Sequence, residues 1–469
     1  MLLSSPTYFL FLGGIFFLYW PLARIRALTL ALILFANYFF YARWDLTLLA
    51  LIPVLSSVDY AIGLGLQRSK SPGPRRLLVA SSIVMNVGAL AFFKYMPFLL
   101  GSWANWTGKQ APQWHWGLPI SLSFYCFQAL TYTIDLYRRD TKGTRSYLAH
   151  LAAVSFFPTT LAGPITRMES LLTQFEKPKK LDPAFGGGAL FLIGLGLIKK
   201  LLIADYLAGN LVNRVFDFPN LYSGMEVLVA VYAYAFELYY DFSGYTDIAI
   251  GSALLLGIKL PANFNRPYAA INVADFWRRW HITFSNWLRD YLYFSFPGKR
   301  TRIMPYLSLI LTMVIGGLWH GPSWNFVVWG AIHGVGLAFV RLWQTMRGKR
   351  LPLPPVQARI RSTLAIFITF QFVAFAWIYF RAPDFQTASA IFGRIGSRTW
   401  ALGNVSPGLW LVLAIGFLFH YLPKNWYEFS LNLYTRAPFY AQAAALVALA
   451  FGLQYVAQTG AAPFIYTKF

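Results

Sequence analysis

Apolar segments long enough to cross a membrane recur along almost the whole chain. A helix needs about 20 mainly apolar residues to span the hydrocarbon core of a bilayer. Some segments are short or merge with a neighbour, so we expect an all-α polytopic membrane protein with about 11–12 transmembrane helices. The candidate segments are roughly 7–23, 27–42, 46–66, 77–100, 118–138, 184–208, 224–256, 305–320, 323–343, 361–381, 408–422 and 436–457.

Composition agrees with lipid as the solvent for most of the chain. Only 12% of the residues are charged, against about a quarter in a soluble protein. Aromatic residues reach 19%, and Trp and Tyr gather at membrane interfaces because their rings are apolar and their N–H or O–H groups are polar. The one cysteine, Cys126, excludes an internal disulfide framework. We interpret it as a core residue rather than a thioester nucleophile.

The formal net charge of +23 could suggest a nucleic-acid partner, but most basic residues stand in short stretches between apolar segments. Lys and Arg accumulate in the cytoplasmic loops of membrane proteins, where they face anionic lipid headgroups. We therefore expect membrane lipid as the partner, no nucleic acid, and an N-terminus outside the cytoplasm. The basic loops follow the first, third, fifth and ninth segments and carry Arg24, Arg26, Arg68, Lys70, Arg75, Arg76, Arg138, Arg139, Lys142, Arg145, Arg347, Lys349 and Arg350.

Two regions break the pattern of straight spans. Residues 146–183 hold an apolar stretch interrupted by Pro158, Gly163 and Pro164, which predicts a re-entrant or interfacial segment. In residues 258–304, Asn272 is a candidate helix cap, and an apolar stripe at three- and four-residue spacing predicts one amphipathic helix at the cytoplasmic interface. The stripe consists of Phe276, Trp280, Phe284, Trp287 and Tyr291. We expect residues 1–469 to form a single domain.

His320 is the foremost candidate for chemistry. It precedes Gly321 and Pro322 within an apolar region, and glycine can end one helix where proline begins the next. A histidine at such a break can reach a cavity from a rigid base, and its near-neutral pKa suits it to take a proton from a hydroxyl group. The alternative is a structural histidine bonded to a backbone carbonyl.

Two further histidines favour structural interpretations on spacing alone. His281 borders the apolar stripe, which favours a polar residue at the interface over a catalytic one. His333 stands between Gly330 and Gly334, a pair that lets helices approach closely, so we expect a packing helix with a hydrogen-bonded histidine.

Acidic and basic residues also occur inside apolar sequence. Asp241 and Asp247 lie in one long apolar segment, and Lys199 and Lys200 lie in another. Buried charges need partners, so we expect a structural ion-pair network, with a proton or ion pathway as the functional alternative. The sequence contains no HExxH motif, Cys/His cluster, P-loop, dinucleotide-binding glycine pattern or GxSxG elbow, so we expect no metal and no bound cofactor.

The ordered motifs resemble the membrane-bound O-acyltransferases, in particular the bacterial branch of alginate O-acetyltransferase membrane subunits. The resemblance runs over nearly the whole chain and is strongest around His281 and His320. It rests on Phe39-Phe40-Tyr41-Ala42, Phe92-Phe93-Lys94-Tyr95, Leu118-Pro119-Ile120-Ser121-Leu122-Ser123-Phe124-Tyr125, Ala162-Gly163-Pro164-Ile165-Thr166-Arg167, Lys199-Lys200, Tyr240-Asp241-Phe242-Ser243-Gly244-Tyr245, Phe276-Trp277-Arg278-Arg279-Trp280-His281, Trp287-Leu288-Arg289-Asp290-Tyr291, Gly316-Gly317-Leu318-Trp319-His320-Gly321 and Phe380-Arg381-Ala382.

The resemblance implies a ring of helices around a central funnel, in the bacterial inner membrane, with a periplasmic N-terminus. It implies that His320 is essential and His281 assists. An acyl group, expected to be acetyl from acetyl-CoA, passes from a cytoplasmic thioester toward an extracytoplasmic polysaccharide with the help of periplasmic partner proteins. Expected pocket and funnel residues are Trp319, Trp324, Asn325, Arg289, Asp290, Tyr240 and Asp241, and Arg278 and Arg279 are expected to bind the donor's phosphates.

Two departures from the family pattern leave the acceptor open. Pro322 replaces the usual small residue, and Phe296-Pro297-Gly298-Lys299-Arg300 replaces Leu-Gly-Gly-Asn-Arg at the cytoplasmic entrance. D-alanyl transfer to teichoic acid is the alternative within the family. A transporter or flippase without acyl chemistry is the alternative outside it, although no internal repeat supports that reading.

Overall fold

A computed structural model describes residues 1–43, 49–119, 121–177, 181–296, 301–347, 354–456 and 464, and the regular elements in these ranges are all helical. The chain forms two compact units: Met1–Ile193 with Ile248–Pro261, and Gly194–Asp247 with Ala262–Phe469. The expectation of one acyltransferase domain over residues 1–469 stays a prediction. Ile120, the entrance residues 297–300, and the basic residues Lys349 and Arg350 lie outside the described ranges.

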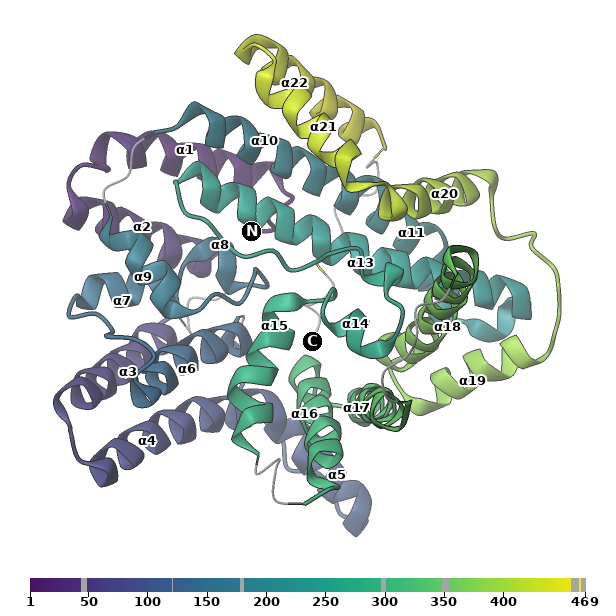
Figure 1. The fold of residues 1–469 in the computed structure, drawn as a ribbon, viewed down its shortest axis with the longest axis horizontal. Coiled ribbons are helices and arrows are strands. Elements are labelled where there is room, and N and C mark those ends of the chain that lie inside the picture. The colour runs from purple at the N-terminus through teal and green to yellow at the C-terminus, as the bar shows by residue number, and fades with distance from the viewer. Residues whose placement is uncertain are drawn as a thin grey trace. The chain divides into compact units, whose positions relative to one another are not determined.

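The first unit consists of helices (Figure 1), and many of their buried side chains are aromatic or aliphatic. Its elements are α1 (Pro6–Leu22), α2 (Arg26–Ala42), α3 (Leu51–Arg68), α4 (Pro72–Leu90), the π-helical η1 (Ala91–Tyr95), α5 (Met96–Thr107), α6 (Leu122–Arg138), α7 (Tyr147–Val154), α8 (Phe157–Thr160) and α9 (Met168–Glu176). Helix α10 (Pro183–Leu197) begins in this unit, and the end of α13 (Gly224–Leu255) belongs to it.

The prediction that residues 146–183 do not form a straight span is confirmed. The segment is divided into the short helices α7, α8 and α9. Asn37 of α2 fixes the break between the first two: its Oδ1 accepts a hydrogen bond from the Phe157 N–H at 2.9 Å, and its Nδ2 donates to Ser155 Oγ at 3.0 Å. A backbone N–H group at the break thereby has a hydrogen-bond partner inside the protein, as apolar surroundings require.

The second unit contains both motif histidines. It starts with the π-helical η2 (Ile198–Ala204), α11 (Asp205–Leu207), the π-helical η3 (Ala208–Val212), α12 (Asn213–Asp217), the 3-10 turn η4 (Pro219–Leu221) and most of α13. It continues through the 3-10 turn η5 (Pro267–Ala269), α14 (Val273–Trp277), α15 (Ile282–Trp287), the π-helical η6 (Leu288–Leu292) and the 3-10 turn η7 (Tyr293–Ser295). It ends with α16 (Met304–His320), α17 (Trp324–Arg347), α18 (Pro355–Arg381), α19 (Phe385–Gly396), α20 (Pro407–Tyr421), α21 (Lys424–Arg436) and α22 (Phe439–Val456).

The expected single amphipathic helix over residues 272–291 is wrong. Asn272 does cap a helix, since its Oδ1 accepts from the Asp275 N–H at 2.9 Å, but α14 ends at Trp277 and α15 starts only at Ile282. Between them His281 adopts a left-handed backbone with φ 41°, which a continuous helix cannot contain. The stripe residues Phe276 and Phe284 are still buried, so the apolar pattern predicts the buried side but not the break.

Helices α16 and α17 form a tightly packed hairpin. A Cβ atom at Gly317 would overlap the carbonyl oxygen of Phe326, and one at Gly330 would overlap that of Met313. Glycine at these positions therefore lets the two backbones touch, as the Gly330–Gly334 spacing predicts. The contact fixes the end of α16, and with it the position of His320.

Adding a methyl group at this contact is expected to destabilise the hairpin. Gly330→Ala must push two backbones apart, which costs about 1–3 kcal/mol, and thermal unfolding of the purified protein measures the loss. Gly393→Ala in α19 is the matched control, because no atom lies within 4 Å of the Cβ it would add. Equal unfolding temperatures for the two variants would contradict this account of the packing.

Several described helices have the length and composition of membrane spans. Four stretches qualify alone, and α20 with α21 qualifies as a pair bent by 94°. The four are Pro72–Thr107, Phe185–Asp217, Trp324–Arg347 and Pro355–Arg381, and shorter apolar helices are Pro6–Leu22, Arg26–Ala42, Met304–His320 and Phe439–Leu453. The chain is a multi-pass membrane protein.

Candidate active site

His320 stands where the chain leaves one helix for the next. It is the last residue of α16; Gly321 is extended, and α17 begins at Trp324. This is the helix break that the glycine and proline predict, with the second helix starting just after the proline. The side chain is 2% exposed, so the imidazole is held by a rigid helix end inside the protein.

Aromatic rings from four helices surround this imidazole. The centroid of the His320 ring lies 5.0 Å from Trp319 of α16, 5.3 Å from Phe284 of α15, 5.2 Å from Trp329 of α17 and 5.2 Å from Phe380 of α18. Such an enclosure keeps bulk water away and strengthens electrostatic interactions within it. The sequence predicts that this histidine reaches a cavity, and the structure shows which aromatic rings surround it.

His281 is held at the start of α15 by a neighbouring amide. Its Nδ1 lies 3.3 Å from Asn263 Oδ1, which also accepts from the Thr283 hydroxyl at 2.6 Å and the Thr283 N–H at 3.3 Å. Because an amide oxygen only accepts, Nδ1 carries the hydrogen and Nε2 the lone pair. Burial lowers the pKa of His281 to about 3, so the ring is neutral at physiological pH.

The two histidines share two aromatic neighbours. The Phe284 ring stacks on His281 at 5.0 Å and lies 4.7 Å from Trp319, which itself borders His320. The distance from His281 to Trp319 is 6.4 Å. The structure thus brings both predicted histidines, from separate parts of the chain, to one aromatic cluster.

His333 has the packing role that its spacing predicts. Its Nδ1 accepts a hydrogen bond from the Trp277 indole N–H at 3.3 Å, and the side chain is fully buried. This contact ties α17 to α14, the short helix that precedes His281. His333 therefore has a structural role, because it holds α14 against α17.

The predicted pocket residues beside His320 differ in their surroundings. Trp319 packs against His320, whereas Asn325 is buried and donates to the Ala382 carbonyl at 2.8 Å, joining α17 to the end of α18. Trp324 exposes 54% of its surface.

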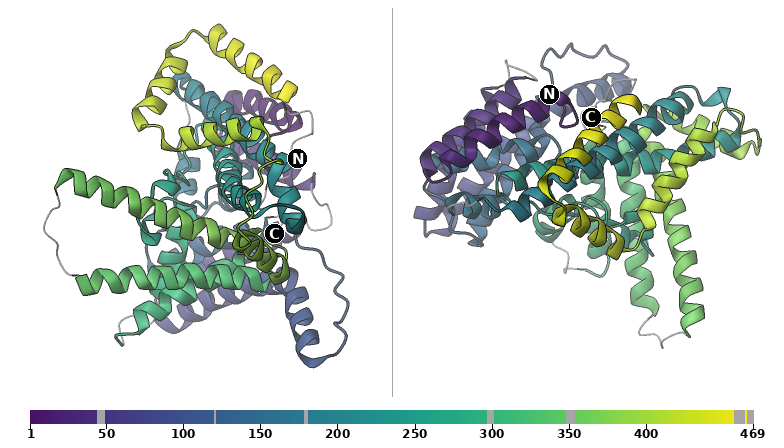
Figure 2. Two further views of the ribbon diagram at one scale, coloured as in Figure 1. Left: turned by 90° about the vertical axis from the view of Figure 1, so that its right-hand side faces the viewer. Right: turned by 90° about the horizontal axis from the view of Figure 1, so that it is seen from above.

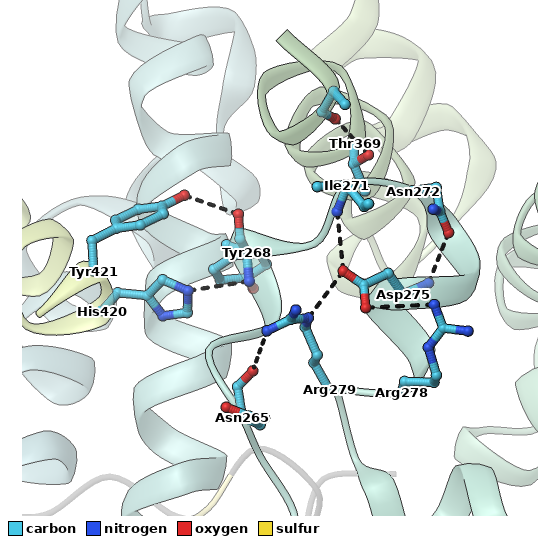
Figure 3. A network of polar contacts seen from close by, with 11 residues as sticks. Asn265, Tyr268, Ile271, Asn272, Asp275, Arg278, Arg279, Thr369, His420 and Tyr421 are labelled. Carbon is cyan, nitrogen blue, oxygen red and sulfur yellow. Dashed lines mark hydrogen bonds and ion pairs between the residues drawn. The ribbon is translucent and has the colours of Figure 1, made fainter. Parts of the chain in front are cut away.

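Arg278 and Arg279 converge on one carboxylate (Figure 3). Asp275 pairs with Arg279 at 3.0 Å and with Arg278 at 3.6 Å. The Arg278 side chain is 69% exposed and that of Arg279 27%. Arg279 therefore fastens the loop around His281, and Arg278 is the one that presents its charge outward.

The charged residues of α13 pair as predicted. Lys200 Nζ lies 2.5 Å from Asp241 and 2.7 Å from Asp205, and Lys199 Nζ lies 2.6 Å from Asp247. The expected structural ion-pair network is confirmed.

The remaining predicted funnel residues bond to one another or to α20; they are Tyr240, Arg289 and Asp290. The Tyr240 hydroxyl donates to the Gly416 carbonyl of α20 at 2.5 Å, so it joins two helices. Arg289 pairs with the neighbouring Asp290 at 2.7 Å, and its side chain is 54% exposed. In the described part of the chain, no cluster of three or more His, Cys, Asp or Glu residues could hold a metal.

Comparison with known proteins decides the family. The model of the membrane-bound O-acyltransferase family matches residues 83–380, which include both motif histidines. The chain belongs to the membrane-bound O-acyltransferase family. It is therefore an acyltransferase, and the resemblance inferred from its motifs is confirmed.

Relatives of this O-acyltransferase carry names for three acceptors. A probable alginate O-acetylase of Azotobacter vinelandii is 38% identical over 87% of this chain and 80% of its own length. A peptidoglycan O-acetyltransferase of Helicobacter pylori is 33% identical over 79% of this chain and 74% of its own. A teichoic acid D-alanyltransferase of Bacillus subtilis is 30% identical over 50% of this chain and 61% of its own.

Reasoning from the sequence missed one polar residue that contacts His281. The side-chain oxygen of Asn263 contacts His281 Nδ1 and accepts from the Thr283 hydroxyl. Asn263 itself lies in the loop before α14. The backbone carbonyl of Asn263 also accepts from the Ile282 N–H at 2.9 Å. Asn263 lies in a loop and no single helix joins it to His281, 18 positions later, so only the fold reveals this pair.

Proposed function

We propose that this acyltransferase moves an acetyl group from a cytoplasmic thioester, acetyl-CoA, toward hydroxyl groups of an extracytoplasmic polysaccharide in a bacterium. The acyltransferase would lie in the inner membrane with a periplasmic N-terminus and pass acetyl to periplasmic partner proteins. The observation that carries the proposal is the placement of His320 in an aromatic enclosure that shares Phe284 and Trp319 with His281. The O-acetyltransferase relatives, which match more of the chain than the D-alanyltransferase does, support acetyl as the transferred group.

The proposed chemistry is general-base catalysis at His320. A ring nitrogen of His320 takes the proton of the acceptor hydroxyl while the hydroxyl oxygen attacks the thioester carbonyl carbon. The tetrahedral intermediate then collapses, the carbon–sulfur bond breaks, and the imidazolium returns the proton to the leaving thiolate. The products are an ester and a free thiol, and the histidine is regenerated. The surrounding rings exclude water, which would otherwise compete as the acceptor.

His281 is proposed to assist from the side on which the donor enters. Its neutral ring presents Nε2, with a lone pair, because Asn263 fixes the hydrogen on Nδ1. Arg278, exposed on the same loop, is proposed to attract the phosphates of coenzyme A.

Asn263 is proposed as a positioning residue that acts through His281. Asn263→Ala is expected to lower kcat by about 10²-fold, because a displaced catalytic side chain costs about that much. KM for the thioester should change little. If Asn263 acts through His281, the Asn263→Ala/His281→Gln double variant should lose no more than the worse single variant. Multiplying losses would show that the asparagine serves another purpose.

Donor choice distinguishes the two transfers within the family. Purified protein in lipid vesicles is given acetyl-CoA or a D-alanyl thioester on a carrier protein, and release of free thiol is followed. The proposal expects turnover of acetyl-CoA and none of the D-alanyl thioester. Turnover of the D-alanyl thioester alone would overturn it.

A further inference from the structure

A groove lies between α17 and α18, and neither His281 nor His320 lines it. The two helices run antiparallel as a pair (Figure 2), and the groove between them has a cavity volume of about 1360 Å³. Pockets for small molecules usually measure about 300–1,000 Å³. The groove is therefore large enough for a ligand bigger than most metabolites.

The walls of the groove are apolar over most of their length. They are formed by one face of each helix, with Phe339 and Val340 from α17 and Ile360, Leu364 and Ile368 from α18. Phe339, Ile360, Leu364 and Ile368 each expose more than half of their surface. Such side chains suit hydrocarbon chains and would be unfavourable against water.

One end of the groove is basic. Arg347, the last residue of α17, and Arg361, near the start of α18, both line it. The Arg347 guanidinium lies 3.7 Å from the centroid of the Trp343 ring, which also lines the groove. None of the described lining residues is acidic. The charge of this end thus complements an anion.

The opposite end of the groove is closed. A Cβ at Gly336 would lie 2.8 Å from the Phe372 ring, so the helices meet there. Asn272, which caps α14, and Thr369 line this closed end (Figure 3). The groove therefore has a polar mouth, an apolar body and a floor.

We propose that this groove binds one anionic phospholipid. Its phosphate would lie at Arg347 and Arg361, and its acyl chains would run along the apolar walls toward Gly336. Basic pockets between membrane helices bind anionic headgroups in this way, and a Trp beside the arginines is typical of the interface. The acyl group of the proposed donor has two carbons, so it is too short to fill the apolar groove.

The test is lipid binding by the purified full-length protein in a neutral detergent. Apparent affinity is measured by native mass spectrometry during titration with phosphatidylglycerol, with phosphatidylcholine as the uncharged comparison. Arg347→Gln/Arg361→Gln should lower the affinity for phosphatidylglycerol about 30-fold, since each basic residue near a headgroup contributes about 1 kcal/mol. Arg359→Gln is the matched control, because Arg359 is exposed on the same helix but does not line the groove.

A second variant tests the apolar body separately. Ala365 lines the groove between the basic end and the floor, and Ala365→Trp should displace the acyl chains while keeping both arginines. The proposal expects loss of phosphatidylglycerol binding in this variant too. Equal binding of the two lipids, unchanged binding in both groove variants, or full competition by coenzyme A without acyl chains would overturn it. None of these readouts depends on acyl transfer, so the proposed function stands or falls separately.

Discussion

Replacing His320 by alanine is expected to lower thioester turnover by about 10²–10⁴-fold, the contribution of a positioned general base. The protein should remain folded, because the His320 ring stands at the end of α16 and packs beside Phe284 and Trp329, which the substitution leaves in place. His320→Gln should be equally inactive, since an amide cannot take the proton. The rate is measured as thiol release from acetyl-CoA by purified protein with an acceptor present.

A neighbouring histidine provides the control for this prediction. His333 is buried in the same unit and accepts a hydrogen bond from Trp277, and His333→Gln keeps an acceptor for that indole N–H. This variant should retain turnover within a few-fold of wild type. If His320→Ala turned over at the wild-type rate, or if both variants lost activity together with unfolding temperature, His320 would be structural.

Removing the Lys200 ammonium is expected to cost about 3–5 kcal/mol of stability, because it would leave two carboxylates without their shared cation. Lys200 is 5% exposed and reaches both Asp205 and Asp241. Lys200→Met has a similar length but no charge, so the loss measures the ion pairs rather than a cavity. Unfolding of the purified protein by heat or denaturant should show a large decrease in the midpoint.

A double variant separates pairing from packing. Lys200→Met/Asp241→Asn removes the more buried of the two partner carboxylates along with the cation, so it should recover part of the lost stability. Lys199→Met, which breaks a pair whose side chains are 18% and 17% exposed, should cost less. Greater damage in the double variant than in Lys200→Met would contradict an ion-pair role.

The parts of the site that follow local rules could be predicted from sequence. A glycine beside a proline predicts the break after His320, and two glycines four residues apart predict the close approach of α16 and α17; the structure shows both. Basic residues in one apolar segment and acidic residues in another likewise predict that Lys199 and Lys200 pair with aspartates, and they do. The helix break depends on residues adjacent in the sequence, whereas the ion pairs follow from the need of buried charges for partners.

The environment of His281 could not be predicted in this way. The spacing from Phe276 to Tyr291 is that of one continuous helix, and no residue in it signals a break. The left-handed turn at His281 is stabilised by Asn263, which bonds to Thr283, Ile282 and the imidazole at once. Tertiary hydrogen bonds thus override a local pattern, and the same bonds give the histidine its orientation.

The most direct test of acyl transfer through His320 is the ester-linked acetate on the extracellular polysaccharide of cells that lack this protein. Cells complemented with the wild-type chain should regain the acetate, and cells complemented with His320→Ala at an equal membrane level should stay at the level of the deletion. Acetate restored by His320→Ala, or no difference between the deletion and the wild type, would contradict the proposed transfer.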